Sequence, residues 1–193
     1  MSRRKRLLVS ATLVVGLLAA VLLRHVRDGG GDVGAFSVRR PMAYAASGIG
    51  RDDGYLGGRE VSVHDGSEPA VTRLDPHLHA ALARAADAAE AAGVTLRINS
   101  GWRSAAYQRV LLEEAEKTYG NATDAGRWVR TPQTSTHVTG EAVDVGPSSA
   151  SRWLVQHGAR YGLCQTYANE PWHFELRATR DGRCPPSRPD SSS

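Results

Sequence analysis

The chain has 193 residues, of which 41% are hydrophobic and 23% charged, and its formal net charge is +4. This length suffices for one domain with a proper core and is too short for two full domains. The charge is unevenly spread: residues 1–28 hold six basic residues and one acid, whereas the other 165 residues hold 18 basic and 19 acidic groups. The basic excess therefore belongs to the N-terminus, and we expect no nucleic-acid binding.

Residues 1–28 have the pattern of a membrane anchor or signal segment. A basic cluster at residues 3–6 precedes an uncharged, mainly apolar run at residues 7–23. As a helix this run is about 25 Å long, at the short end of what spans a bilayer. The basic cluster should stay cytoplasmic, which places the rest of the chain outside the cell in a single-pass arrangement. We favour an uncleaved anchor, because leucine stands where a signal peptidase requires a small residue; secretion after cleavage is the alternative.

Residues 29–52 are glycine-rich without sustained periodicity, and we expect a flexible linker. A domain is expected over residues 53–184. At its start, residues 54–56 and 60–64 are compatible with a short edge hairpin.

Two helices and a strand are predicted next. Asp75 is a good N-cap, Pro76 suits a first helical position, and Gly93 ends the apolar periodicity. Residues 94–98 alternate as a half-buried strand, and a second helix is expected from about residue 104 to residue 117.

The C-terminal half is less regular. Residues 121–134 show no strong pattern and are expected to form a loop. A strand is predicted at residues 141–145, a short helix from residue 149 or 151 to residue 157, and final strands within residues 167–176. The composition of residues 185–193 predicts a disordered tail.

Cys164 and Cys184 are an even pair in a chain expected to be exported. We predict a disulfide between them, with two free thiols as the alternative.

Residues with distinctive chemistry lie in two stretches, STHVTGEAVD from Ser135 to Asp144 and EPWHFE from Glu170 to Glu175. Two histidines and an aspartate are a ligand set that catalytic zinc accepts, with one position left for water. In these stretches they are His137, Asp144 and His173. Glu170, three residues before the last histidine, can take the proton from that water.

The surroundings of these residues fit a metal site. Gly140 lies midway between His137 and Asp144, where a backbone without a Cβ can turn sharply. Asp144 sits in a short apolar run that reads as a buried strand, and a metal neutralises such a charge. Pro171 disfavours a helix at Glu170, so we expect a bent, extended segment there.

Ser-x-His-x-x-Gly-x-Ala-x-Asp followed by Glu-x-Trp-His resembles the signature of the VanY-type zinc D-alanyl-D-alanine carboxypeptidases. An upstream Ser-Gly-Trp-Arg-Ser element, from Ser100 to Ser104, strengthens the resemblance, which extends over residues 53–176. Three motifs in order and properly spaced are a strong signal.

The resemblance implies an α+β domain, with a small antiparallel sheet, helices mainly on one side and a single zinc ion bound by His137, Asp144 and His173. It also implies Glu170 as catalytic base, and Arg103 as a residue that binds substrate and steadies the reacting carbonyl. Ser135 either hydrogen-bonds the substrate or holds the His137 loop. Gln108, one turn beyond Arg103, either lines the pocket or faces solvent. Trp172 is expected in the pocket wall.

The expected substrate is a peptidoglycan stem peptide losing its terminal D-Ala, and the expected state is a monomer. Three alternatives remain open at this point: an L,D-carboxypeptidase, an L-Ala–D-Glu endopeptidase, and a non-catalytic cell-wall-binding protein that keeps zinc as a structural part. The intact Glu170 argues against the last, because a structural site needs no base.

Overall fold

The structure, a computed structural model, describes residues 47–178 and 181–193. Its elements are η1 (Arg51–Asp53), β1 (Val61–Ser62), α4 (Pro69–Thr72), α5 (Pro76–Ala91), β2 (Arg97–Ser100), α6 (Ala105–Tyr119), α7 (Ala122–Gly126), α8 (Thr136–Thr139), β3 (Ala142–Gly146), α9 (Ser148–His157), η2 (Gly158–Tyr161), β4 (Leu163–Gln165) and β5 (His173–Leu176). The expected membrane segment and most of the expected linker lie outside these residues. Within the described ranges, no helix is long and apolar enough to cross a bilayer.

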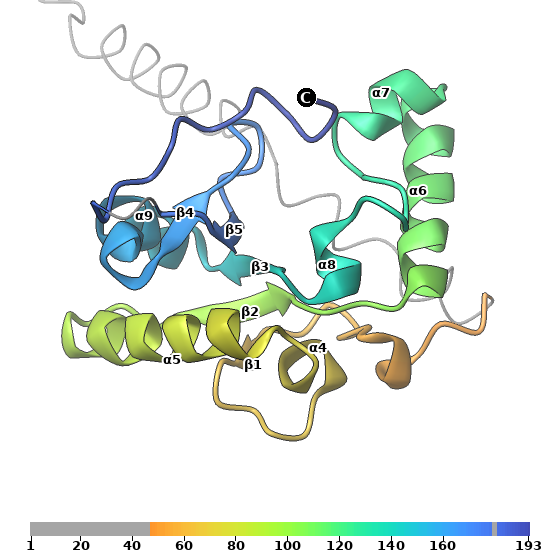
Figure 1. The fold of residues 1–193 in the computed structure, drawn as a ribbon. Helices are drawn as coiled ribbons and strands as arrows, with labels where there is room; N and C mark the ends of the chain where they lie inside the picture. Colours follow the sequence, from red (N-terminus) through yellow and green to blue (C-terminus); the bar gives the residue numbers. More distant parts are fainter. Residues whose placement is uncertain (1–46, 179–180) are drawn as a thin grey trace, which may run out of the picture. The chain divides into compact units, whose positions relative to one another are not determined.

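A five-stranded antiparallel sheet in the order β1-β2-β3-β5-β4 organises the domain. Its central strand β3 is buried on both faces, with Val143 and Val145 almost fully enclosed. α5 and α9 pack against each other and against the sheet (Figure 1), and their apolar side chains share one core with it. The predicted α+β class with a small antiparallel sheet is confirmed.

α5 begins and ends as its sequence indicates. The Asp75 carboxylate accepts hydrogen bonds from the backbone N–H groups of His77 and Leu78, and Gly93 follows the helix at φ +74°. Leu78 and Leu82 lie on the face that enters the core and are almost fully buried.

The segment between α5 and α6 differs in detail from the expectation. β2 starts three residues later and ends two residues later than predicted, and its register against β3 shifts between Ile98 and Ser100. Such a bulge bends a strand, and β2 ends just after it, at Ser100 of the Ser-Gly-Trp-Arg-Ser element. The expected hairpin within residues 54–64 does not form, because β1 pairs with β2 instead.

A second apolar cluster joins α6 to the segment that follows it. Tyr107, Leu111 and Ala115 of α6 pack against Ala125 and Val129. The expected loop at residues 121–134 contains a helix, α7, which Asn121 caps by accepting from the N–H of Asp124. Five helical residues are too few to show apolar periodicity, so their sequence gave no helical signal.

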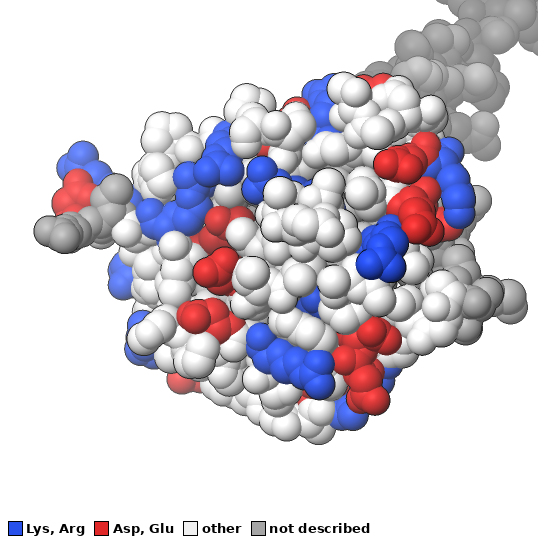
Figure 2. Space-filling view, turned by 45° about the vertical axis from the view of Figure 1, so that its right-hand side comes forward, with Lys and Arg blue, Asp and Glu red and all other residues white. Residues whose placement is uncertain are grey.

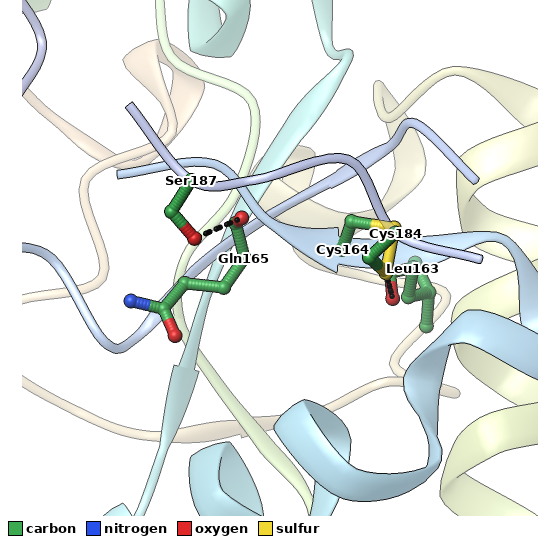
Figure 3. Close-up of a disulfide and its surroundings, with 5 residues drawn as sticks. All are labelled: Leu163, Cys164, Gln165, Cys184 and Ser187. Atoms are coloured by element: carbon green, nitrogen blue, oxygen red, sulfur yellow. Dashed lines mark hydrogen bonds between the residues drawn. A yellow bond between two sulfur atoms is a disulfide. The ribbon is translucent and has the colours of Figure 1, made fainter. Parts of the chain in front are cut away.

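The C-terminal segment, residues 184–193, which we name the C-terminal strap, lies along the domain. It begins at the predicted disulfide, Cys164–Cys184, and Ser187 Oγ donates to Gln165 O at 3.1 Å (Figure 3). The strap then reaches α7, where Ser191 Oγ donates to Gly126 O at 2.9 Å. This placement differs from the disorder expected over residues 185–193, because composition does not reveal partners that lie far away in the chain.

The charges on the described surface are mixed. On the face in Figure 2, basic and acidic side chains are interspersed and neither sign dominates. This distribution agrees with the near balance of acidic and basic groups after residue 28.

Candidate metal centre and active site

Three elements deliver the predicted metal ligands to one point. His137 lies in the single turn α8, Asp144 in the central strand β3, and His173 at the start of β5. Asp144 and His173 face each other as a cross-strand pair. Gly140 ends α8 at φ +80°, and a Cβ there would lie 2.6 Å from Arg73 O, so the sharp turn predicted at Gly140 is confirmed.

The ligand atoms form a compact triangle. His137 Nε2 lies 3.3 Å from His173 Nδ1 and 3.4 Å from Asp144 Oδ1, and His173 Nδ1 lies 3.2 Å from Asp144 Oδ1. Tetrahedral zinc with bonds of about 2.0–2.1 Å separates its ligand atoms by about 3.4 Å. The triangle therefore has the dimensions of three corners of a zinc tetrahedron.

The far nitrogen of each imidazole is held by the protein. His137 Nδ1 lies 2.8 Å from Gly101 O, and His173 Nε2 lies 3.0 Å from Glu175 Oε1. Because these acceptors each take one ring N–H group, the nitrogens that face the triangle can present lone pairs to a metal when the rings are neutral. Two such nitrogens and a carboxylate oxygen converging in a buried site call for a cation, so the donor set fits a metal.

The pKa values of the three cluster residues agree with this need for positive charge. Burial lowers the pKa of His137 to about 4, with Arg103 adding to the effect. Burial also lowers the pKa of His173, but hydrogen bonds to Asp144 and Glu175 outweigh it and raise that pKa to about 9. The two imidazoles hold the pKa of Asp144 well below its ordinary value despite its burial. Without a metal, the site therefore attracts a proton in its place.

Glu170 stands beside the triangle and is 7% exposed. Its Oε2 lies 3.9 Å from His173 Nδ1, and its buried Oε1 has no hydrogen-bond partner among the described residues. Burial raises the pKa of Glu170 to about 7, although His173 partly offsets the rise. Glu170-Pro171 forms a turn closed by His173 N donating to Glu170 O, not a helix, as Pro171 indicated.

Arg103 approaches the cluster from the other side. Its Nη2 lies 3.6 Å from Asp144 Oδ2, and its Nε is buried without a partner in the described part of the chain. Gly101, two residues earlier, lies closely against α4, since a Cβ there would lie only 2.0 Å from Ala70 O. The Ser-Gly-Trp-Arg-Ser element thus orients His137 through the carbonyl of Gly101 and brings in the cation of Arg103 two residues later.

Gln108 and Ser135 both line the pocket next to the cluster. Gln108 is buried; its Nε2 donates to Arg130 O at 2.7 Å, while its Oε1 has no partner among the described residues. Ser135 precedes α8, and its hydroxyl does not cap that helix. Of the alternatives given for Gln108, the structure selects the pocket.

Several pocket or support residues were not anticipated. Tyr167, Arg130 and Ser191 line the pocket, and Glu175 holds His173. Tyr167 packs its ring 5.0 Å from that of His173 and forms the aromatic wall expected of Trp172, which is not among the lining residues. Of these residues, only Glu175 could have been found from the sequence. It lies two residues after His173, and side chains two residues apart on a strand point to the same face.

Known proteins resemble this chain over the same region. A family model described as VanY, D-alanyl-D-alanine carboxypeptidase, matches residues 71–178. A D-alanyl-D-alanine carboxypeptidase of Enterococcus faecalis (strain ATCC 700802 / V583) is 32% identical over 53% of this chain and 47% of the relative. The chain thus spans about half the length of the curated relative that it matches.

Two solved structures share the fold. A mutant of the vancomycin resistance D,D-pentapeptidase VanY from the VanB-type resistance cassette, in complex with Zn(II), is 27% identical, with a TM-score of 0.51 over 61% of this chain and 77% of the other. VanYB in complex with D-alanine-D-alanine is 26% identical, also with a TM-score of 0.51, over 61% and 76% of the two chains. The family model covers more than half of the sequence and includes every residue of the metal cluster, and the chain belongs to the VanY family of D-alanyl-D-alanine carboxypeptidases.

Proposed function

We propose that this protein is a zinc-dependent D,D-carboxypeptidase that removes the terminal D-Ala from peptidoglycan stem peptides. One observation carries the proposal: two imidazole nitrogens and a carboxylate oxygen converge within 3.4 Å of one another, beside a buried carboxyl group with a raised pKa. The solved VanY relative in complex with Zn(II) and VanYB in complex with D-alanine-D-alanine support the choice of metal and substrate.

His137, Asp144 and His173 would hold the zinc ion. Bound there, zinc supplies Lewis-acid chemistry, polarising an amide carbonyl and making water easier to deprotonate. The protein contributes the orientation of both imidazoles through Gly101 O and Glu175.

Glu170 serves as the general base and then as the general acid. Its unpartnered Oε1 accepts a proton from the attacking water and later delivers it to the amine of the leaving D-Ala. Burial raises the pKa of Glu170 in the metal-free site, which is the direction that lets one carboxyl group both accept a proton and return it near neutral pH.

Arg103 stabilises the negative charge that develops on the scissile carbonyl oxygen. Its unpartnered Nε is a buried donor next to the cluster, and such a preorganised donor is typically worth about 10²–10³ in kcat. The unpartnered Oε1 of Gln108 can accept a hydrogen bond from a substrate N–H, and the hydroxyl of Ser135 is available to the substrate.

The experiment combines zinc content with D-Ala release from a stem pentapeptide ending in D-Ala-D-Ala. We expect about one zinc per chain, loss of activity with a chelator and recovery with added zinc. A tetrapeptide ending in a single D-Ala, and intact L-Ala–D-Glu bonds, serve as competing substrates. Preferred cleavage of either would replace the D,D-specificity with one of the alternative specificities, and a zinc-loaded protein inactive on all three would overturn the enzymatic proposal.

Two variants separate catalysis from metal binding. Glu170→Gln should keep zinc and lose at least about 10² in rate, because only basicity is removed. His173→Ala should lose zinc affinity and activity together. A Glu170→Gln protein as fast as the parent would show that Glu170 is not the base.

A further inference from the structure

The C-terminal strap reaches the pocket beside the metal cluster, although it has no role in the mechanism above. Its Ser191 is buried and is one of the residues that line this pocket. The strap lies beyond residue 178, where the match to the family model ends. Its contribution to the pocket is therefore additional to the part of the chain that matches the family.

Two walls of the pocket come from separate parts of the fold. Trp128, Val129 and Arg130 line it from the segment after α7, and Trp128 and Val129 pack in the apolar cluster of α6 and α7. Tyr167 and His173 line it from the segment that leads into β5, a strand of the sheet. The space between these two walls depends on how the two parts of the fold are held together.

The strap is bonded to the wall that belongs to the sheet. Arg188 N donates to Thr166 O at 2.9 Å, and Arg188 O accepts from Ala168 N at 2.8 Å. These two bonds lie on either side of Tyr167, which pairs with Arg188 as an isolated β-bridge. The backbone of Tyr167 is thus fixed to the strap.

Two residues later the strap is bonded to the other wall. Arg127 Nε donates to Asp190 Oδ2 at 3.0 Å, and Ser191 Oγ donates to Gly126 O at 2.9 Å. Two residues of extended backbone span at most about 7 Å. Between Arg188 and Asp190 the strap is therefore a short tether, and Figure 1 shows it running from the side of β4 to α7.

The carboxylate of Asp190 connects the strap to the wall through both of its oxygens. Oδ1 accepts from Ser192 N at 3.0 Å, which fixes the side chain to its own segment, and Oδ2 faces Arg127. Hydrogen bonds from Ser192 and Arg127 lower the pKa of Asp190, so the group is charged at neutral pH. Because Arg127 directly precedes Trp128, this ion pair fixes the start of the wall.

We propose that the strap is a clasp that sets the separation of the two pocket walls, with Asp190 as a positioning residue that acts through Arg127. The proposal rests on the proposed carboxypeptidase function and adds an element that prepares the pocket for the peptide. A pocket held in advance binds its ligand at a smaller entropic cost, so the clasp lowers KM. The chemical step does not depend on it, because Gly101 O and Glu175 orient the metal ligands and neither belongs to the strap.

The test measures D-Ala release from a stem pentapeptide ending in D-Ala-D-Ala by the zinc-loaded protein. Asp190→Asn removes the charge and keeps the size of the side chain. It should raise KM about 3–10-fold and leave kcat and zinc affinity unchanged. Ending the chain after Arg188 should raise KM at least as much, because the contacts of Ser191 are lost as well. Asp190→Glu should restore part of the loss, since it returns the carboxylate.

Two further variants keep the interpretation specific. Arg127→Gln should raise KM to the same extent as Asp190→Asn, and combining the two changes should add little, because both remove one interaction. Lys117→Gln breaks another exposed ion pair, with Glu114 at 3.2 Å on α6, and should leave KM unchanged.

An unchanged KM in Asp190→Asn would overturn the proposal. A fall in kcat or in zinc affinity as large as the rise in KM would also overturn it, because a general loss of structure would then explain the result.

The proposed function fails separately, if the parent protein releases no D-Ala. The clasp is then judged by amide hydrogen exchange at residues 128–130 of the zinc-loaded protein, which Asp190→Asn should accelerate. Unaltered exchange at these residues would overturn the clasp, whatever the substrate of the enzyme.

Discussion

The two imidazoles of the metal cluster are each oriented by one hydrogen bond from outside the cluster. Gly101 O holds His137, and Glu175 holds His173 while also accepting from Thr136 Oγ1 at 3.1 Å. Such partners fix the tautomer and raise the basicity of the nitrogen that faces the metal. Glu175 is charged, with a pKa that its hydrogen bond to His173 lowers despite burial.

Glu175→Gln tests this arrangement. The variant keeps the size of the side chain and removes its charge, so zinc affinity should fall about 10–100-fold, measured by competition with a chelator of known affinity. Glu113→Gln, on the exposed face of α6, is the matched control and should leave the affinity unchanged. An unaltered zinc affinity in Glu175→Gln would contradict the role given to Glu175.

Glu170 makes a pH-dependent contribution to the stability of the metal-free protein. Its pKa is about 7 when folded and 4.5 ordinarily, so between these values the unfolded chain loses a proton that the folded chain keeps. Unfolding therefore becomes more favourable as pH rises through this window. Above pH 7 this contribution to the free energy of unfolding is lower by about 3 kcal/mol than below pH 4.5, because a pKa difference of one unit corresponds to about 1.4 kcal/mol.

Glu170→Gln should remove this dependence. In urea unfolding with a chelator present, the variant should gain stability over the parent between pH 4.5 and pH 7, with no such gain below pH 4.5. A difference between parent and variant that stays constant from pH 4 to pH 8 would argue against the raised pKa.

At the scale of elements, the site depends on backbone hydrogen bonds that join α4, the segment after β2 and α8. Trp102 N donates to Ala70 O at 2.9 Å, and Arg103 N donates to His137 O at 3.2 Å. These bonds join α4, the end of β2 and α8 around Gly101. The position of His137 thus depends on the backbone of an element far from it in sequence.

Gly101→Ala should disturb this junction. The added Cβ would meet Ala70 O at 2.0 Å, so backbone must move, and we expect a loss of about 1–3 kcal/mol in unfolding free energy together with weaker zinc binding. Gly126→Ala is the control, since no heavy atom lies within 4 Å of its Cβ, and its stability should stay within about 1 kcal/mol of the parent. A Gly101→Ala protein as stable as Gly126→Ala would contradict the close approach.

At the scale of the whole molecule, the C-terminal strap connects the sheet to the α6–α7 cluster. Arg188 N donates to Thr166 O and Arg188 O accepts from Ala168 N, and further along Asp190 and Ser191 are buried against the end of α7. The disulfide anchors the near end of the strap (Figure 3). The strap therefore supports the pocket wall that carries Arg130.

Ending the chain after Pro186 tests this support while retaining the disulfide. The truncated protein should show faster amide hydrogen exchange at residues 125–130, because their contacts with Asp190 and Ser191 are lost. Exchange in α5, which lies in the core of the sheet, should be unchanged. Uniform acceleration over the whole domain, or none at residues 125–130, would contradict a local role for the strap.

The location of the protein stays a prediction from residues 1–28. The basic cluster and apolar run predict a membrane-bound protein with its catalytic domain outside the cell. Protease added to intact cells should digest the domain and spare an N-terminal fragment, whereas release of the domain into the medium would favour signal cleavage. Full-length protein found only in the cytosol would contradict both.

From the sequence by itself we predicted the three residues of the metal cluster with Glu170 beside them, the helices α5 and α6 and the disulfide pair, and the structure brings these residues together as predicted. These depend on signals that lie close together in the chain: ligand spacing, helix caps, apolar periodicity and an even cysteine count. Only the tertiary structure revealed the positions of Glu175 behind His173 and of Tyr167 and Arg130 in the pocket lining, and the path of the C-terminal strap. Arg130 and Tyr167 are 37 residues apart, and Arg127 and Asp190 are 63 apart. Pairing over such separations is set by how the sheet and the α6–α7 cluster pack together, and no local pattern in the sequence encodes it.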